Sequence, residues 1–559
     1  MSHPDPTTAP LITRRCALAG AGALALGLAA CSDEGGASGD AAQERVFTWG
    51  VKNTKETLDM QHSTQNGTIP GAICECLVSF SQDDGTVSPV LLTGLPEASE
   101  DGLTYSFELA EGISFHDGST LTAEDVRYTF TRMFVPEQAS VCSGYYVMIV
   151  GAQAMLDGEA TELEGFTVED DRHFTIRLEY PYAPFVSALT LAFAEIFPRE
   201  ACEAAGDDWG IGTLVGTGPY RLVSSTETGV SLEAFPDYHG GAPALDRLEI
   251  VYIDDNNTKM LNYKAGDVDA CELDATLLSQ YQGDAEVADQ IVSYEPMGTC
   301  FVNVNLNMPE FSDPRVREAL SLAINRQELV DTLLSGAGTP ATQFLNPREI
   351  GYDDSREAYA YDPERARELL AEAGAEGLSF TAMTRASEQN IMVALQAYWA
   401  EIGVDVRVET LDNGVWTDTR AQGGMPATIV TWLTTVPFEG AVHLSSWFKT
   451  ENASKRSSFY ANPEFDATCD EALSELDEDR RARPAGRPHP HAAGLGHDPA
   501  LLSQAPDRPE AVGVRHRVPE RHHRAERRLG GHGAEERVAR RTRRAKGTGT
   551  FARKVRAKV

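Results

Sequence analysis

The sequence predicts a mixed α/β protein with more than one domain. At 559 residues, 42% of them hydrophobic, the chain is too long for one ordinary core and apolar enough to fold. Segments with apolar residues at every second position alternate with segments that carry helix start and stop signals. This mixture is typical of folds that combine sheets with helices.

Residues 1–31 have the pattern of an export signal. Arg14 and Arg15 precede a 15-residue apolar run, Cys16–Ala30, which is too short for a comfortable membrane span. The run ends in Leu28–Cys31, which resembles the lipobox of bacterial lipoproteins, so we expect Cys31 to be acylated and to become the mature N-terminus. A plain small-residue cleavage site is the alternative. Residues 32–44 then predict a flexible tether at the outer face of the membrane.

The export route and the cysteines leave alternatives open. Thr13-Arg14-Arg15 resembles a twin-arginine signal, although Ala17-Leu18 stand where Phe-Leu is usual, so both general secretion and twin-arginine export are possible.

Without Cys16 and Cys31, seven of the nine cysteines remain. An oxidising compartment permits disulfides, but an odd number leaves at least one thiol unpaired. Cys74 and Cys76 lack the spacing of a zinc site, and no metal centre is predicted.

The composition changes sharply at residue 480. The tail, residues 480–559, has 21 basic and 7 acidic residues, a net charge of +14, and the remaining 27 basic and 77 acidic residues give residues 1–479 a net charge of −50. The tail also lacks Tyr, Trp, Ile, Met, Cys and Asn. Translation of a GC-rich gene in a wrong frame yields this residue set, and we interpret the tail as frameshifted and disordered. A natural basic tail that binds nucleic acid or anionic lipid is the alternative. The acidic body argues against nucleic acid as a partner.

The acidic part of the chain, residues 1–479, contains both strand and helix signals. Period-two patterns predict strands at 104–109, 173–180 and 404–408. The helix signals are a capping box at Thr122–Asp125, a start at Asp313-Pro314 and a start at Asp362-Pro363, the last helix ending at Gly374. The predicted core-facing positions of these helices are Val126, Phe130 and Met133; Val316, Leu320, Ala323 and Ile324; and Ala366, Leu369, Leu370 and Ala373.

Six segments of the chain, taken in order, resemble the family 5 solute-binding proteins of ABC importers, which include dipeptide-, oligopeptide- and nickel-binding proteins. The resemblance spans roughly residues 45–479. The matching segments are Thr57-Leu58-Asp59; Phe115–Gly118 continuing into Leu121–Val126; Gly216–Tyr220; Ala265–Asp269; Asp313–Leu320 with Ala323–Arg326; and Tyr361–Pro363 with Ala366, Leu369, Leu370 and Ala373-Gly374.

The resemblance implies a two-lobed clamshell, like that of periplasmic binding proteins, with an additional intercalated domain. The first lobe is discontinuous, residues 45–85 and 215–298; residues 86–214 form the inserted domain and residues 299–479 the second lobe. A peptide or peptide-like solute binds in the cleft, and the closed form docks on the permease of an ABC importer driven by its ATPase. No cofactor is implied. In relatives, the backbone returns from the second lobe to the first near the C-terminus, which supplies a second crossover and closing strands. A frameshifted tail would remove this return, so we expect this exact chain to fold poorly or bind weakly.

The resemblance also indicates ligand-binding residues. In peptide-binding relatives, a Trp of the second lobe is followed three residues later by an Asp that pairs with the peptide's α-amino group. Trp432 matches the Trp, whereas Thr435 stands where the Asp should be and cannot supply a full charge. Glu439 is a candidate substitute. A blocked peptide, a metal chelate or another solute therefore stays open, as does a purely structural role for Trp432 as a core aromatic.

Other functions have less support. The histidines His62, expected near the cleft mouth, and His443 favour a metal-chelate carrier only loosely. No H-E-x-x-H, G-x-S-x-G or phosphate-binding glycine motif indicates an enzyme, so an extracellular hydrolase is a remote alternative. A surface interaction module of the same fold is a further rival, and binding to a partner protein without any solute would distinguish it.

Overall fold

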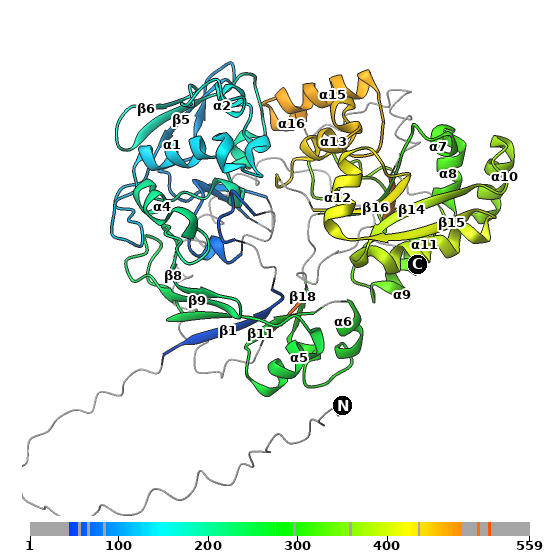
Figure 1. The fold of residues 1–559 in the computed structure, drawn as a ribbon, viewed down its shortest axis with the longest axis horizontal. Helices are drawn as coiled ribbons and strands as arrows, with labels where there is room; N and C mark the ends of the chain where they lie inside the picture. Colours follow the sequence, from blue (N-terminus) through cyan, green and yellow to red (C-terminus); the bar gives the residue numbers. More distant parts are fainter. Residues whose placement is uncertain are drawn as a thin grey trace, which may run out of the picture. The chain divides into compact units, whose positions relative to one another are not determined.

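The computed structural model describes residues 44–53, 57–63, 68–81, 85–273, 275–293, 298–356, 360–433, 436–481, 500–503 and 512–515 (Figure 1). The predicted lipidation site Cys31 and the tether lie outside the described residues. All elements below belong to one compact unit that begins at Arg45. Three sheets and one hairpin organise this unit, and the predicted mixed α/β class is confirmed.

The first sheet has seven strands in the order β12-β18-β11-β1-β10-β9-β8. Its central strand β1 (Val46–Val51) pairs in parallel with both neighbours, β10 (Arg247–Tyr252) and β11 (Ala270–Glu272). The remaining strands are β8 (Tyr220–Thr226), β9 (Gly229–Ala234), β12 (Ile291–Ser293) and β18 (Val512–Arg515). The helical segments of this part of the chain are α5 (Asn256–Ala265), α6 (Ala275–Tyr281) and η6 (Ala288–Gln290). Asp255 caps α5 by accepting a hydrogen bond from the Thr258 N–H at 2.8 Å.

Residues 86–214, which we call the intercalated region, contain a four-stranded antiparallel sheet. Its order is β4 (Glu97–Ala98), β5 (Thr104–Glu108), β7 (His173–Arg177) and β6 (Phe166–Val168). The predicted alternation is confirmed, because Tyr105, Phe107, Phe174 and Ile176 are all buried. Phe107 and Phe174 stack with ring centroids 4.7 Å apart. The hairpin β2 (Val78–Phe80) and β3 (Val87–Pro89) lies at the start of this region.

The capped helix predicted at residue 122 is α1 (Ala123–Arg132). Thr122 and Asp125 form the expected capping box, in which the Thr122 N–H donates to the Asp125 carboxylate at 3.0 Å. Val126 and Phe130 are fully buried. Shorter helical segments complete the region and its approaches: η1 (Pro70–Ala72), η2 (Pro136–Gln138), η3 (Ser143–Tyr145), α2 (Ala152–Leu156), α3 (Phe185–Ala188), η4 (Ala192–Ala194), α4 (Arg199–Ala205) and η5 (Gly206–Asp208).

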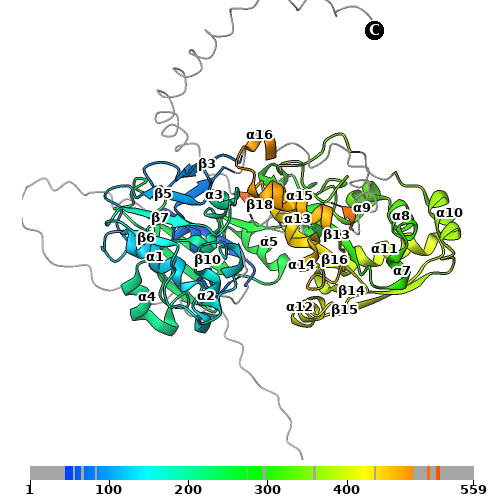
Figure 2. The same ribbon diagram turned by 90° about the horizontal axis from the view of Figure 1, so that it is seen from above.

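Residues 298–481, which we call the C-terminal region, hold most of the third sheet, β15-β14-β16-β13-β17. β13 and β16 pair antiparallel along their whole length (Figure 2). The strands are β13 (Gly298–Val304), β14 (Ser379–Arg385), β15 (Asp405–Leu411), β16 (Ala427–Leu433) and β17 (Ala500–Ser503). Helix α11 (Gln389–Glu401) packs on β15 and β14 (Figure 1) and buries Trp399 completely.

The two predicted Asp-Pro helix starts of this region are confirmed. Asp313 caps α8 (Pro314–Leu322) through the Arg315 N–H, and Asp362 caps α10 (Pro363–Ala373) through the Arg365 N–H, each at 2.8 Å. Gly374 ends α10 with a φ of +67°, which a glycine adopts without a Cβ clash. The other helical segments are α7 (Pro309–Ser312), α9 (Arg326–Leu333), η7 (Ala386–Glu388), α11 (Gln389–Glu401), α12 (Asn413–Ala421), α13 (Gly440–Phe448), α14 (Thr450–Ala453), α15 (Pro463–Ser474) and α16 (Glu478–Arg481).

The basic tail differs from its expected structure. β17 adds to the edge of the third sheet beside β13, and β18 lies between β11 and β12 in the first sheet. The expectation of a tail without strands, and of a first sheet without a partner for its edge, is therefore wrong for these eight residues. The physical reason is that a sheet edge offers backbone hydrogen bonds to any short extended segment, so pairing does not require a regular side-chain alternation. Whether the tail is out of frame stays a prediction.

A chain that ends at Arg481 tests the contribution of these two strands. We expect its unfolding midpoint to fall by about 5 °C or more, because several ladder hydrogen bonds of about 0.5–1.5 kcal/mol each are lost. β12 also joins the first sheet through β18 in the described structure. Differential scanning calorimetry of both chains is the measurement. Identical unfolding transitions would contradict the pairing and support the out-of-frame interpretation.

Two further observations concern the cysteines and the hydropathy of the described residues. Cys74, Cys76, Cys142, Cys202, Cys271, Cys300 and Cys469 are all free thiols. At least one unpaired thiol was expected from the odd number. Within the described residues, no helix has both the length and the apolar character to cross a bilayer.

Candidate ligand-binding site

Asp59, the last residue of the Thr57-Leu58-Asp59 motif, joins the start of the chain to helix α1. Its buried carboxylate accepts hydrogen bonds from the Gln61 N–H at 3.0 Å, from His62 at 2.8 Å and from Arg132 at 2.7 Å. Arg132 also donates to the Gln61 Oε1 at 2.8 Å. The motif therefore builds an internal ion-pair network that holds the intercalated region against the first sheet.

His62 belongs to this network, and both of its ring nitrogens already have hydrogen-bond partners. Its Nδ1 lies 2.8 Å from the Asp59 carboxylate and its Nε2 lies 2.7 Å from the Gln138 carbonyl oxygen. Because both partners are acceptors, the ring fits best as an imidazolium that donates from both nitrogens. The hydrogen bond to Asp59 accordingly raises the pKa of His62. The predicted role of His62 in ligand binding stays a prediction.

Three arginines converge on two tryptophans in the C-terminal region, and we call this group the arginine cluster: Arg385, Arg420, Arg456, Trp416 and Trp447. The Arg420 guanidinium lies 4.5 Å from the Trp416 ring centroid and 5.5 Å from that of Trp447. Arg385 lies 4.5 Å from Trp416, and Arg456 lies 4.6 Å from Trp447. Cation–π contacts of this kind hold guanidinium groups in place without neutralising them.

The three guanidinium groups of the arginine cluster have different partners. Glu388 forms an ion pair with Arg385, and Arg456 donates to the Ser446 carbonyl at 3.0 Å. Within the described part of the chain, the Arg420 guanidinium has neither a carboxylate partner nor a hydrogen-bond acceptor. Burial, together with the charges of Arg456 and Arg385, lowers the pKa of Arg420 to about 10. Arg420 is therefore still charged at neutral pH.

One tyrosine of the intercalated region acts electrostatically on the arginine cluster. Tyr145 lies close enough to Arg456 to favour its charged form, whereas burial lowers the pKa of Arg456. Tyr145 in turn stacks on Phe193, with ring centroids 5.2 Å apart and planes 28° apart. Tyr145 and Phe193 therefore belong to a part of the sequence far from the arginine cluster, and the charge of Arg456 is sensitive to that part.

The structure places the predicted site residues in different environments. Trp432 lies on β16 opposite Thr299 of β13, but its side chain and all of Thr435 lie outside the described residues. Glu439 is buried and accepts hydrogen bonds from the Ser187 hydroxyl and from Arg481, each at 3.2 Å. A protein cation thus already neutralises the carboxylate that was expected to replace the missing Asp. His443 is buried and bonded to Glu349.

Sequence reasoning missed the arginine cluster. Trp416 and Arg420 are four residues apart on α12 and share one helix face, which is a detectable signal. Arg385 ends β14 and Arg456 follows α14, and no spacing connects either of them to α12. Only the packing of β14, α12 and α13 brings the three guanidinium groups together.

Comparison with known proteins identifies the family. The sequence profile of the bacterial extracellular solute-binding proteins, family 5 (Middle), matches residues 86–455, which is about two thirds of the chain. The chain belongs to this family. This solute-binding protein is 29% identical over 464 residues to the glutathione-binding protein GsiB of Salmonella typhimurium, covering 79% of this chain and 85% of that protein. It is 29% identical over 439 residues to the heme-binding protein A of Haemophilus influenzae, covering 73% and 77%.

Solved structures show the same fold. HbpA2 from Haemophilus parasuis superposes with a TM-score of 0.72 at 21% identity, covering 84% of this solute-binding protein and 96% of that chain. The periplasmic binding protein DppA from Helicobacter pylori, in complex with the peptide STSA, superposes with a TM-score of 0.69 at 21% identity, covering 84% and 94%. This solute-binding protein therefore has the mixed α/β fold of two-lobed periplasmic binding proteins, as its sequence predicts; the division into lobes and an intercalated domain stays a prediction.

Proposed function

We propose that this protein captures a peptide-like solute with at least one carboxylate outside the membrane and delivers it to the permease of an ABC importer. The observation that carries the proposal is the half-buried Arg420 guanidinium, which is held between two tryptophans, is flanked by two further arginines and has no anionic partner among the described residues. A planar guanidinium matches a carboxylate through two parallel hydrogen bonds.

The relatives support the chemical class of the solute. GsiB is named as glutathione-binding, and glutathione is a tripeptide-like molecule with two carboxylates. A related Brucella ovis protein, 28% identical over 337 residues, is named as a putative ABC transporter peptide-binding protein. We further propose that the protein binds and releases its solute without covalent chemistry, as expected of a carrier.

A metal-chelate carrier has little support from the described histidines. Both ring nitrogens of His62 already have partners, and His443 is bonded to Glu349. Within the described ranges, no three His, Cys, Asp or Glu side chains gather in a way that could hold a metal ion.

Two measurements test the proposed function. Native mass spectrometry of the protein purified from its own host weighs a retained solute directly. Isothermal titration calorimetry then compares glutathione with its bis-carboxamide, in which both carboxylates are blocked. We expect micromolar or tighter binding of glutathione and at least about 100-fold weaker binding of the amide, since each charged hydrogen bond contributes about 1.5–3 kcal/mol. Equal affinities would refute a carboxylate site.

We also propose that Cys31 anchors the protein to the outer face of the cell membrane through acyl chains. The support is Leu28-Ala29-Ala30-Cys31 at the end of an apolar run. We expect Cys31→Ser to move the protein from the membrane fraction to the medium or periplasm, because the thioether that holds the lipid cannot form. Fractionation followed by immunoblotting is the measurement. Unchanged membrane association of the variant would exclude the anchor.

A further inference from the structure

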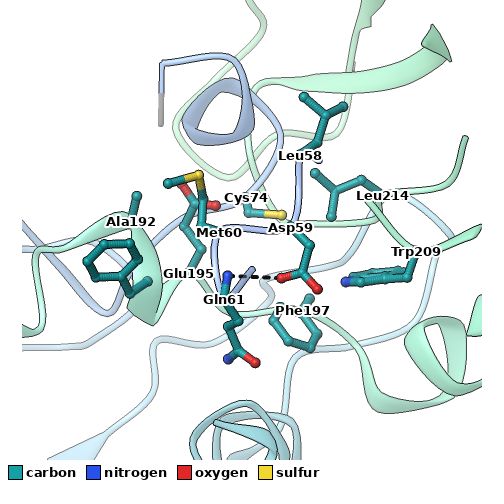
Figure 3. Close-up of a pocket in the computed structure, with 11 residues that line it drawn as sticks. Leu58, Asp59, Met60, Gln61, Cys74, Ala192, Glu195, Phe197, Trp209 and Leu214 are labelled. Carbon is teal, nitrogen blue, oxygen red and sulfur yellow. Dashed lines mark hydrogen bonds between the residues drawn. The ribbon is translucent and has the colours of Figure 1, made fainter. Parts of the chain in front are cut away.

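The arginine cluster brings like charges together, whereas the buried network around Asp59 joins opposite charges. At Asp59, Arg132 and donors such as the Gln61 N–H attract the carboxylate (Figure 3). In the arginine cluster, burial lowers the pKa of Arg420, and the charges of Arg456 and Arg385 lower it further. Cation–π contacts attract each guanidinium to a ring, but they do not cancel the repulsion between guanidinium groups. The backbone must therefore hold these groups close together.

Arg420 and Arg456 approach the same ring from different segments. Their guanidinium groups lie 5.5 and 4.6 Å from the Trp447 ring centroid. Arg420 lies in the last turn of α12, whereas Arg456 lies in the turn that follows α14. The spacing of the two groups therefore depends on how the turn after α14 is fixed to the end of α12.

Ser457 makes this connection. It is fully buried, and its hydroxyl donates to the Arg420 carbonyl oxygen at 2.9 Å and accepts from the Met425 N–H at 3.4 Å. One side chain thus joins the residue next to Arg456 to the backbone of Arg420 itself. Because the hydroxyl is buried with both of its partners, its removal leaves a buried N–H group without this acceptor.

The backbone at Ser457 is strained, with a φ of +56°. A residue with a Cβ adopts this left-handed conformation at a cost in free energy, and only where its surroundings impose it. The Arg456 carbonyl accepts from the Asn303 side chain at 3.0 Å, and the Ser458 carbonyl accepts from the Leu306 N–H at 2.9 Å. The turn is therefore fixed to β13 and the residue after next on one side, and to α12 on the other.

We propose that Ser457 is a positioning residue: its hydroxyl sets the spacing of the Arg420 and Arg456 guanidinium groups, and this spacing determines how well the arginine cluster fits a carboxylate. The consequence for the solute rests on the proposed function. A guanidinium group displaced by about 1 Å keeps its charge but no longer directs its donors as a carboxylate requires. Ser457 acts through Arg420 and Arg456, and not by touching the solute.

Ser458 offers a matched control. It is equally buried, and its hydroxyl donates to the Ala453 carbonyl at 3.3 Å and accepts from the Tyr460 N–H at 3.5 Å. Both partners belong to the same stretch of chain as Ser458, so this hydroxyl stabilises the turn without a bond to α12. Ser457→Ala and Ser458→Ala each remove one buried hydroxyl, but only Ser457→Ala releases Arg420.

The first test measures the arginine cluster without any solute. In protein labelled with ¹⁵N-arginine, the ring currents of Trp416 and Trp447 shift the Nε–H resonance of Arg420, which is assigned by its loss in Arg420→Lys. We expect Ser457→Ala to move this resonance toward the ordinary arginine position and Ser458→Ala to leave it in place. Ser457→Gly also lacks the hydroxyl but relieves the backbone strain, so it gives the same readout should the alanine variant misfold. An Arg420 resonance that stays in place in Ser457→Gly would overturn the proposal.

The second test measures the consequence for the solute. Isothermal titration calorimetry compares glutathione with its bis-carboxamide in the wild type, Ser457→Gly and Ser458→Ala. We expect Ser457→Gly to bind glutathione about 10-fold more weakly, with the same number of sites per chain and an unchanged affinity for the amide. Ser458→Ala should keep the wild-type affinity for both.

A merely structural role of Ser457 would give a different result. It would lower the fraction of binding-competent protein in both serine variants and leave the glutathione affinity of the remainder unchanged, and this outcome would overturn the proposal. If the wild type binds no glutathione, the proposed function fails in this assay, and the Arg420 resonance still decides whether Ser457 positions the arginine cluster.

Discussion

Arg132→Met is expected to destabilise the protein by about 3–5 kcal/mol, the usual cost of breaking a buried ion pair. Arg132 donates to Asp59 and Gln61, and its guanidinium lies 5.6 Å from the Phe197 ring centroid. Its removal leaves the Asp59 carboxylate, which is 4% exposed, with His62 as its remaining charged partner. The measurement is the urea midpoint of unfolding.

Arg127→Met on the same helix is the matched control. Arg127 pairs with Glu124 at the surface, where an ion pair contributes about 0–1 kcal/mol. We expect its urea midpoint to remain near that of the wild type. Similar midpoints for Arg132→Met and Arg127→Met would show that the network around Asp59 does not hold the intercalated region in place.

The same network predicts a dependence on pH. Burial raises the pKa of Asp59, but the hydrogen bond from His62 and the charge and hydrogen bond of Arg132 outweigh burial and lower that pKa below its ordinary value. A lowered pKa in the folded state contributes stability that is present above the unfolded pKa of about 3.9 and is lost as the pH falls through the folded pKa. The acid-induced loss of stability should therefore be smaller in Arg132→Met than in the wild type.

Arg420→Ala is expected to weaken the binding of glutathione, or of the solute retained from the host, by about 100-fold. The change removes two charge-assisted hydrogen bonds of about 1.5–3 kcal/mol each, part of which Arg385 and Arg456 compensate. Arg420→Lys keeps the charge but loses the planar pair of donors, so we expect an intermediate affinity. Isothermal titration calorimetry is the measurement.

Two controls separate this effect from misfolding and from general electrostatics. Arg407→Ala removes an exposed positive charge from β15 and should leave affinity within about twofold of the wild type. The unfolding midpoint of Arg420→Ala should change little, because relief of the repulsion from Arg385 and Arg456 offsets the lost ring contacts. An unchanged affinity of Arg420→Ala would remove the basis of the proposed carboxylate site.

The helices and strands that were predicted have local causes. The caps Thr122, Asp313 and Asp362 satisfy backbone N–H groups of their own first turns, and Gly374 ends its helix through its own φ. The alternation in β5 and β7 reflects one buried and one exposed face. The two strands of the tail were not predictable, because their backbone partners on β11, β12 and β13 lie about 200 residues or more away in the sequence.

The sequence by itself determined the class of protein: an ordered set of capped helices, strands and motifs carries the family, and hence a fold that binds solutes. Only the tertiary structure decided which side chains are available to a ligand. Glu439 and His62 were candidate ligand contacts, yet Arg481 and Asp59 already engage them, whereas Arg420 was not a candidate and has no anionic partner within the described residues. The physical reason is that a charge becomes available or neutralised only through neighbours from distant segments, and composition and spacing do not record those neighbours.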